Sequence, residues 1–169
     1  MRTALGALLV AAAVAGGVVP ARGQVFSIGG GPARDVASDA PFARGFNVQA
    51  GAEFGLPLLP VAIRVEGMLN RFGSELDEGH FQVLAGTVNA VLELPALGLV
   101  PYLVGGVGVY RVPQPPGAPV DARRSIRGVN AGAGVRLGLG GRGLFLETRL
   151  HSTTDFETVF APVVIGIRF

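Results

Sequence analysis

The sequence contains no cysteine, no lysine and no tryptophan. Without cysteine the chain forms no disulfide bond and offers no thiolate ligand to a metal. All of its 14 basic residues are arginine, and charged residues make up 15% of the chain, against roughly 25% in ordinary soluble domains. So little charge excludes a coiled coil. A net charge of +2 is also too small and too scattered to indicate nucleic-acid binding.

The chain is rich in apolar residues and in glycine. Hydrophobic residues make up 49% of the chain, which is too apolar for a disordered protein. The 27 glycines follow no G-X-Y period, and this excludes collagen. A length of 169 residues fits one domain.

The first 23 residues have the pattern of a signal peptide. A basic start at Arg2 is followed by an apolar run over 4–19 and by the small-x-small site Ala21-Arg22-Gly23. The alternative is a retained membrane anchor, but the run is short for a span of about 20 residues. We therefore expect cleavage after Gly23 and a single β-barrel domain over 24–169. Cleavage would remove two arginines and leave 12 Arg against 12 Asp and Glu.

After residue 24, apolar residues recur at every second position, which is typical of half-buried strands. The pattern predicts eight strands, at about 24–33, 45–56, 61–72, 81–94, 100–112, 127–139, 142–152 and 158–169. The predicted connections are alternately long and polar (33–44, 73–80, 113–126, 152–157) and short (56–60, 95–99, 140–141). Long loops at one end and tight turns at the other are the plan of bacterial transmembrane barrels. The strand lengths also suit a bilayer, which needs about 9–11 residues per tilted strand.

The two faces of the predicted strands differ in charge. One face is almost entirely apolar, as in Phe46, Val48, Ala50, Ala52 and Phe54. The other carries four Glu and four Arg: Glu53, Arg64, Glu66, Glu93, Arg136, Glu147, Arg149 and Arg168. An eight-stranded barrel is only wide enough to be filled by its own side chains, and buried ions need partners. We therefore predict that the charged face lines the lumen as a balanced network, with glycines leaving room, and that the apolar face meets lipid. The fold class is thus an all-β, eight-stranded, antiparallel, up-and-down transmembrane barrel.

Two segments resemble a known family. The last strand ends in Phe169, preceded by apolar residues at alternate positions, namely Val163, Ile165 and Ile167. This resembles the C-terminal signal that the barrel-assembly machinery reads in bacterial outer-membrane barrels. The Pro-Tyr…Gly-Gly-x-Gly stretch over 101–111 is also similar to a strand of small OmpA/OmpX-type barrels. The resemblance implies a non-enzymatic, monomeric protein of the Gram-negative outer membrane, in contact with lipid and lipopolysaccharide. It implies no cofactor and no nucleic-acid partner.

Two other functions remain open from the sequence. Some small outer-membrane barrels are lipid A deacylases, and His151-Ser152 with Glu147 or Glu157 nearby suggests a hydrolase. Adjacent strand residues point to opposite faces, so this pair would meet only where the strand has ended or bulged. The third hypothesis is a soluble barrel that binds a hydrophobic ligand.

The remaining motifs predict surface features. The stretch 138–143 matches G-x-G-x-x-G, but an alternating strand follows it instead of a helix, so we interpret it as a turn. An acidic loop at Glu75, Asp77, Glu78 and His80 is interpreted as solvated, with cation binding as the alternative. Near the predicted loop 113–126, the candidates for lipopolysaccharide phosphates are Arg111, Arg123, Arg124 and Arg127. Aromatic residues near strand ends are expected in sparse interfacial girdles, with simple packing as the alternative: Phe26, Phe46, Phe54, Tyr102, Tyr110 and Phe169.

Overall fold

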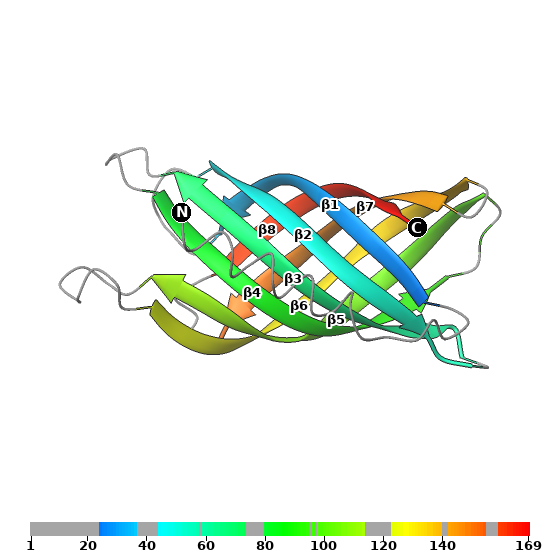
Figure 1. The fold of residues 1–169 in the computed structure, drawn as a ribbon, viewed down its shortest axis with the longest axis horizontal. Helices are drawn as coiled ribbons and strands as arrows, with labels where there is room; N and C mark the ends of the chain where they lie inside the picture. Colours follow the sequence, from blue (N-terminus) through cyan, green and yellow to red (C-terminus); the bar gives the residue numbers. More distant parts are fainter. Residues whose placement is uncertain are drawn as a thin grey trace.

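The chain forms one closed, eight-stranded antiparallel barrel (Figure 1). The structure is a computed structural model, and it describes residues 24–36, 44–57, 59–73, 80–94, 96, 98–113, 123–139, 142–154 and 159–169. The strands are β1 (Gln24–Asp35), β2 (Arg44–Gly55), β3 (Val61–Gly73), β4 (His80–Glu93), β5 (Leu99–Pro113), β6 (Arg123–Leu139), β7 (Arg142–Thr153) and β8 (Val159–Arg168). Each strand pairs with its sequence neighbours, and β1 pairs with β8 to close the barrel. The predicted all-β, eight-stranded, antiparallel, up-and-down barrel is confirmed. None of these described residues forms a helix long and apolar enough to cross a membrane.

The largest difference from the predicted boundaries is at β6. The strand begins at Arg123 instead of about residue 127, and its first residues pair with the end of β5 through Pro113↔Arg123 and Val112↔Arg124. Arg123 and Arg124 were predicted in a loop, but their backbones extend the β5–β6 hairpin. The period-two signal is weak here because two adjacent arginines interrupt the alternation of apolar and polar residues.

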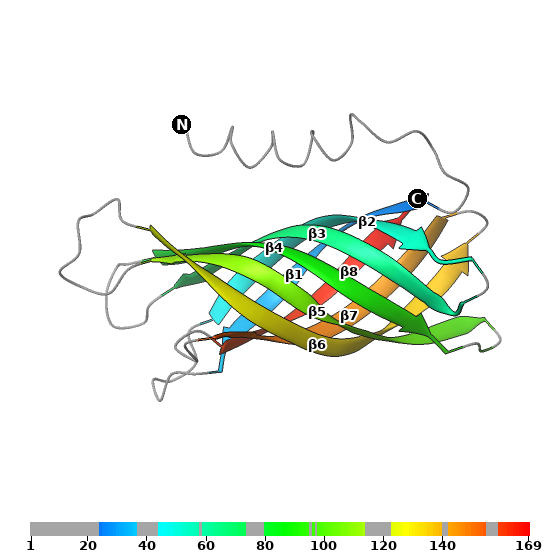
Figure 2. The same cartoon turned by 90° about the horizontal axis from the view of Figure 1, so that it is seen from below.

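The strand ends define the two ends of the barrel, as Figures 1 and 2 show. Strands β1, β3, β5 and β7 end, and β2, β4, β6 and β8 begin, at the same end, which we call the loop end. At the opposite end, β1 begins at Gln24 and β8 ends at Arg168, the residue before Phe169. We call this the terminal end. In the short connection between β4 and β5, Gly98 adopts a φ of 82°, which a residue with a side chain rarely tolerates.

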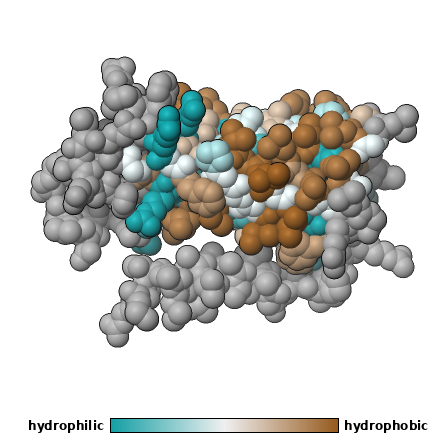
Figure 3. All heavy atoms as spheres, turned by 90° about the horizontal axis from the view of Figure 1, so that it is seen from above, coloured by the Kyte–Doolittle hydropathy of each residue, from teal (hydrophilic) through white to brown (hydrophobic). Residues whose placement is uncertain are grey.

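The outer face is apolar through the middle of the barrel. Ile165 is 64% exposed and Val107 62%, and Leu103, Leu146 and Leu150 are also exposed. Figure 3 shows this apolar surface in brown over the middle of one face, with hydrophilic residues in teal towards the loop end. Large apolar side chains thus point outward from neighbouring strands, and the charged face is turned inward.

Glycines on the inner face make room for large side chains on neighbouring strands. A Cβ added to Gly134 would meet the ring of Tyr102, and one added to Gly132 would meet Arg149. At Gly51 an added Cβ would lie 2.6 Å from Cγ of Glu66. Gly67, on the outer face, has nothing within 4 Å of such a Cβ. The inner glycines are therefore required by the packing of the lumen.

We predict that Gly134→Ala destabilises the barrel and that the matched outer-face change Gly67→Ala does not. Overpacking at Gly134 should cost about 1–3 kcal/mol of unfolding free energy, and Gly67→Ala should change it by less than about 0.5 kcal/mol. Urea unfolding of the detergent-solubilised protein measures both. Equal effects of the two substitutions would contradict the packing role of Gly134.

Candidate functional site

The interior nearest the loop end is closed by an apolar cluster. It consists of Ala33, Met68, Phe72, Val83, Ala85, Tyr110, Val112, Ile126 and Phe160. Within it the ring of Phe160 packs edge-on against Phe72, at a centroid distance of 5.9 Å, and against Tyr110 at 6.3 Å. These residues continue the inward register of the charged face, but they carry no charge, so charge alone does not reveal them in the sequence.

A layer of amide side chains lies next along the lumen. Nδ2 of Asn47 donates to Oδ1 of Asn70 at 2.8 Å. Nδ2 of Asn130 donates to Oδ1 of Asn89 at 2.9 Å. Asn89 in turn donates to Oε2 of Glu66 at 2.9 Å. The amides thus connect the interior near the loop end to a layer of charges.

Arg64 on β3 is the centre of the charged layer. Its Nε donates to Oε2 of Glu53 at 2.9 Å, and its Nη1 donates to Oε2 of Glu147 at 2.6 Å. The same nitrogen lies 3.4 Å from Oε1 of Glu66. One buried guanidinium thus joins carboxylates from β2, β3 and β7, and it fixes strands on opposite sides of the barrel.

Arg149 extends the network towards the amide layer. It donates to Oε2 of Glu66 at 2.6 Å and to Oε1 of Gln49 at 3.1 Å. Its Nε forms an ion pair with Oε1 of Glu147 at 2.8 Å. Since Arg149 is among the largest fully buried side chains, these charge-assisted bonds are what makes its burial possible.

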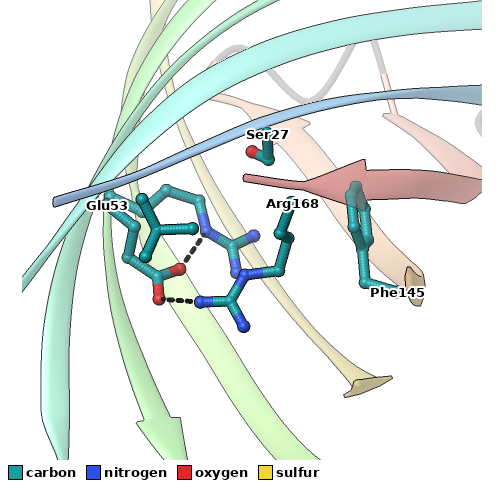
Figure 4. A pocket seen from close by; sticks show the side chains of 6 residues that line it. Ser27, Glu53, Phe145 and Arg168 are labelled. Atoms are coloured by element: carbon teal, nitrogen blue, oxygen red, sulfur yellow. Dashed lines mark hydrogen bonds and ion pairs between the residues drawn. The ribbon is translucent and has the colours of Figure 1, made fainter. Parts of the chain in front are cut away.

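Towards the terminal end, Glu53 accepts from three arginines. Besides Arg64, Arg136 donates to its Oε2 at 2.6 Å. Arg168 donates to its Oε1 at 3.1 Å (Figure 4). Arg136 also pairs with Glu93. The side chains of Glu93 and Arg168 are 43% and 21% exposed, so the network reaches solvent at this end.

Tyr102 packs inside the charged layer. Its hydroxyl donates to Oε2 of Glu147 at 2.7 Å, and its ring lies beneath the guanidinium groups of Arg64, at 5.4 Å, and Arg136, at 4.3 Å. For Tyr102 and Tyr110 the girdle position is wrong and the packing alternative is confirmed, because the two side chains are 1% and 0% exposed. The inner glycines beside them, such as Gly134, were the available signal for an inward tyrosine.

His151 and Ser152 do not form a catalytic pair. His151 is fully buried, its Nδ1 lies 3.0 Å from the hydroxyl of Tyr110, and its ring stacks on Phe160. Oγ of Ser152 is placed to donate to its neighbour's carbonyl, Thr153 O, at 3.4 Å. The strand continues through both residues, so the bulge or strand end that a hydrolase would need is absent here.

The other predicted site residues lie outside the lumen. Arg111 and Arg127 are exposed near the loop end, while Arg123 and Arg124 are described only by their backbone pairing. Val163, Ile165, Ile167 and Phe169 are exposed on the outer face of the last strand segment. Glu75, Asp77 and Glu78 lie outside the described residues, and His80 begins β4. Among the described residues, no cluster of His, Asp and Glu could hold a metal ion.

The interior therefore performs a structural task. The space lined by Val25, Ser27, Glu53, Arg64, Phe145 and Arg168 leaves no cavity for a water molecule (Figure 4). Apolar side chains occupy the lumen nearer the loop end, amides follow, and ion pairs lie towards the terminal end. Such an interior holds the wall together by cross-barrel bonds.

We predict that Arg64→Met destabilises the barrel far more than Arg168→Met. The first change leaves Glu53, Glu66 and Glu147 without their shared cation and should cost about 3–5 kcal/mol. Arg168 is partly exposed and makes one ion pair, so its loss should cost about 1 kcal/mol or less. Urea unfolding in detergent measures the difference. Similar costs would show that the network contributes little to stability.

Three solved structures share this architecture. Neisserial surface protein A (NspA) is 16% identical, covers 89% of this chain and 98% of its own, and superposes with a TM-score of 0.72. Ail, the attachment invasion locus protein of Yersinia pestis, is 19% identical, with 88% and 100% coverage and a TM-score of 0.57. The N-terminal barrel domain of Pseudomonas aeruginosa OprF is 15% identical, with 86% and 97% coverage and a TM-score of 0.53. No protein-family model and no curated protein sequence matches the chain. The chain has the fold of the small eight-stranded outer-membrane β-barrels.

Proposed function

We propose that this chain is a non-enzymatic integral protein of the bacterial outer membrane. It crosses the bilayer as a monomeric barrel, with the loop end outside and the terminal end in the periplasm. The observation that carries the proposal is the distribution of polarity, with a broad apolar outer face around a lumen that contains the ion pairs. The fold shared with NspA, OprF and Ail supports the same conclusion.

The energetics favour lipid over water around the barrel. Exposed apolar surface in water is unfavourable by roughly 25 cal/mol per Å², and monomeric soluble proteins rarely expose a continuous apolar patch of more than a few hundred Å². Closure of the barrel pairs β1 with β8, so no edge strand exposes unpaired backbone N–H and C=O groups to lipid. A soluble barrel for a hydrophobic ligand would need a polar exterior and an open apolar interior. This chain has the opposite distribution.

Exposed arginines near the loop end support contact with lipopolysaccharide. Arg44, Arg71, Arg111 and Arg127 are exposed on β2, β3, β5 and β6. Arg111 pairs with Ser125, two residues before Arg127, so Arg111 and Arg127 are diagonal neighbours, roughly 7–8 Å apart. Arginine binds phosphate through two parallel N–H bonds. We infer that these residues hold the phosphates of the outer leaflet and that the barrel contributes to envelope integrity or presents its loops for surface interactions.

Fractionation of the producing cell tests the location. The protein should appear in the outer-membrane fraction and migrate faster unheated than boiled on a detergent gel. Ile165→Arg should impair assembly, because Arg near the bilayer midplane costs about 2–4 kcal/mol, and Ile165→Val serves as its control. Recovery of the unaltered protein in the soluble periplasm, or normal assembly of Ile165→Arg, would overturn the transmembrane orientation of this face.

A second experiment tests the arginines. The double variant Arg111→Gln with Arg127→Gln should bind purified lipopolysaccharide at least tenfold more weakly, since each charged hydrogen bond contributes about 1.5–3 kcal/mol. Dephosphorylated lipopolysaccharide provides the control, because both proteins should bind it equally. An unchanged affinity of the variant for the phosphorylated form would exclude these residues as a phosphate contact.

A further inference from the structure

Four exposed leucines lie at the terminal end of the barrel, on the side formed by β2 to β5. Leu56 and Leu59 belong to the connection between β2 and β3, and Leu94 and Leu99 flank the connection between β4 and β5. Their exposed fractions are 38%, 59%, 45% and 47%. We call these four residues the leucine rim. Turns that face water are expected to be polar, so the rim does not have the composition of a surface in water.

The two connections form one apolar patch that continues the outer face of the barrel. The backbone N–H of Glu93, at the end of β4, donates to the carbonyl of Pro60, in the other connection, at 3.1 Å. The sequence has no charged residue over 54–63 or over 94–110. On β5 the rim leads along the same face to the exposed Leu103. The rim is therefore continuous with the surface that the proposed function places in lipid.

The backbone of the connection between β2 and β3 suits an apolar environment. The N–H of Leu56 donates to the carbonyl of Val61 at 3.0 Å, and the N–H of Leu59 donates to the carbonyl of Leu56 at 3.3 Å. Pro57 and Pro60 have no N–H to satisfy. Unpaired backbone groups are costly in lipid, and each N–H among the described residues of this connection has a partner. The connection can therefore leave water without exposing a backbone donor.

The height of the apolar face places the rim at the border of the bilayer. Arg71 and Val61 lie on the outer face of β3 and are ten residues apart. A tilted strand rises about 2.5 Å per residue along the barrel axis, so this distance is about 25 Å, the usual height of the apolar band of such barrels. On β5, Arg111 and Leu99 are twelve residues apart, which corresponds to about 30 Å. With the arginines at the outer surface of the membrane, no height is left for a polar margin below the band.

We propose that the leucine rim is inserted in the periplasmic leaflet and is covered by the acyl chains of phospholipids. The proposal rests on the proposed membrane location and adds the depth at which this side of the barrel sits. The connection between β6 and β7 differs, because Arg142 directly follows it. The rim therefore anchors one side of the terminal end, the side formed by β2 to β5.

Tryptophan fluorescence of the full protein in phosphatidylcholine vesicles tests the depth of the rim. The chain has no tryptophan, so a single introduced indole is the only one. Leu59→Trp and Leu99→Trp should be quenched by phospholipids brominated in the upper acyl chain and protected from iodide added on both sides. Leu103→Trp is the control inside the apolar band and should behave in the same way. Thr154→Trp is the control in water and should show the opposite pattern, since Thr154 is exposed beyond the end of β7.

Cysteine labelling checks the result without the preference of tryptophan for membrane interfaces. The chain has no cysteine either. In vesicles, Leu59→Cys should react with a water-soluble maleimide about tenfold more slowly than Thr154→Cys, because the reactive thiolate forms poorly in apolar surroundings. In urea, where both chains are unfolded, the two rates should be equal. The mobility shift on heating verifies that every variant is folded before reconstitution.

The controls separate failure of this proposal from failure of the proposed function. If Leu59→Trp and Leu99→Trp are quenched by iodide as strongly as Thr154→Trp while Leu103→Trp is protected, the rim faces water and the proposal is overturned, but the membrane location stands. The same holds if Leu59→Cys reacts as fast as Thr154→Cys in vesicles. Such a result would assign the rim to a protein partner, since these vesicles contain only phospholipid. Iodide quenching of Leu103→Trp as well would overturn the membrane location itself.

Discussion

The structure depends on one constraint: every buried charge needs a partner of opposite charge inside the barrel. The lumen is narrow enough to be filled by side chains, so these partners must be other side chains of the inner wall. Each buried guanidinium of the network contacts at least two carboxylates, and Arg64 contacts three. Removing a charge from water costs several kcal/mol, so these groups are tolerable only because each has partners. Some partners lie on the same or the paired strand, and others, as in Arg64–Glu147, Arg136–Glu53 and Arg149–Glu66, on strands that are not neighbours. The network thereby acts as a set of cross-links through the interior.

This constraint accounts for the composition of the inner wall. Several of the large inner side chains lie beside a glycine on the paired strand, as Tyr102 does beside Gly134 and Arg149 beside Gly132. The apolar cluster around Phe72 and Phe160 then fills the part of the interior that has no charge. Polar and apolar packing together leave the charged centre without room for a water molecule. We therefore interpret the barrel as a rigid scaffold, and its chemistry is expected at the two ends.

The two ends present different chemistry. Near the loop end, Arg44, Arg71, Arg111 and Arg127 are exposed. At the terminal end, the partly exposed Glu93 and Arg168 bring the ion network to the surface. Exposed charges thus occur at both ends, and the buried charges between them neutralise one another.

The sequence by itself determined the number of strands, the assignment of their faces and the inward position of charges such as Glu53 and Arg149. Those features follow from the alternation of side chains between the two faces of a strand. This alternation is the same whichever strands pair with one another. Only the tertiary structure decided which charges meet, because partners such as Arg64 and Glu147 are 83 residues apart and are brought together by closure of the barrel. It also decided that Tyr102 and Tyr110 point inward and that β6 starts at Arg123. Those outcomes depend on space left by glycines and on pairing across strands, and neither can be read along one strand.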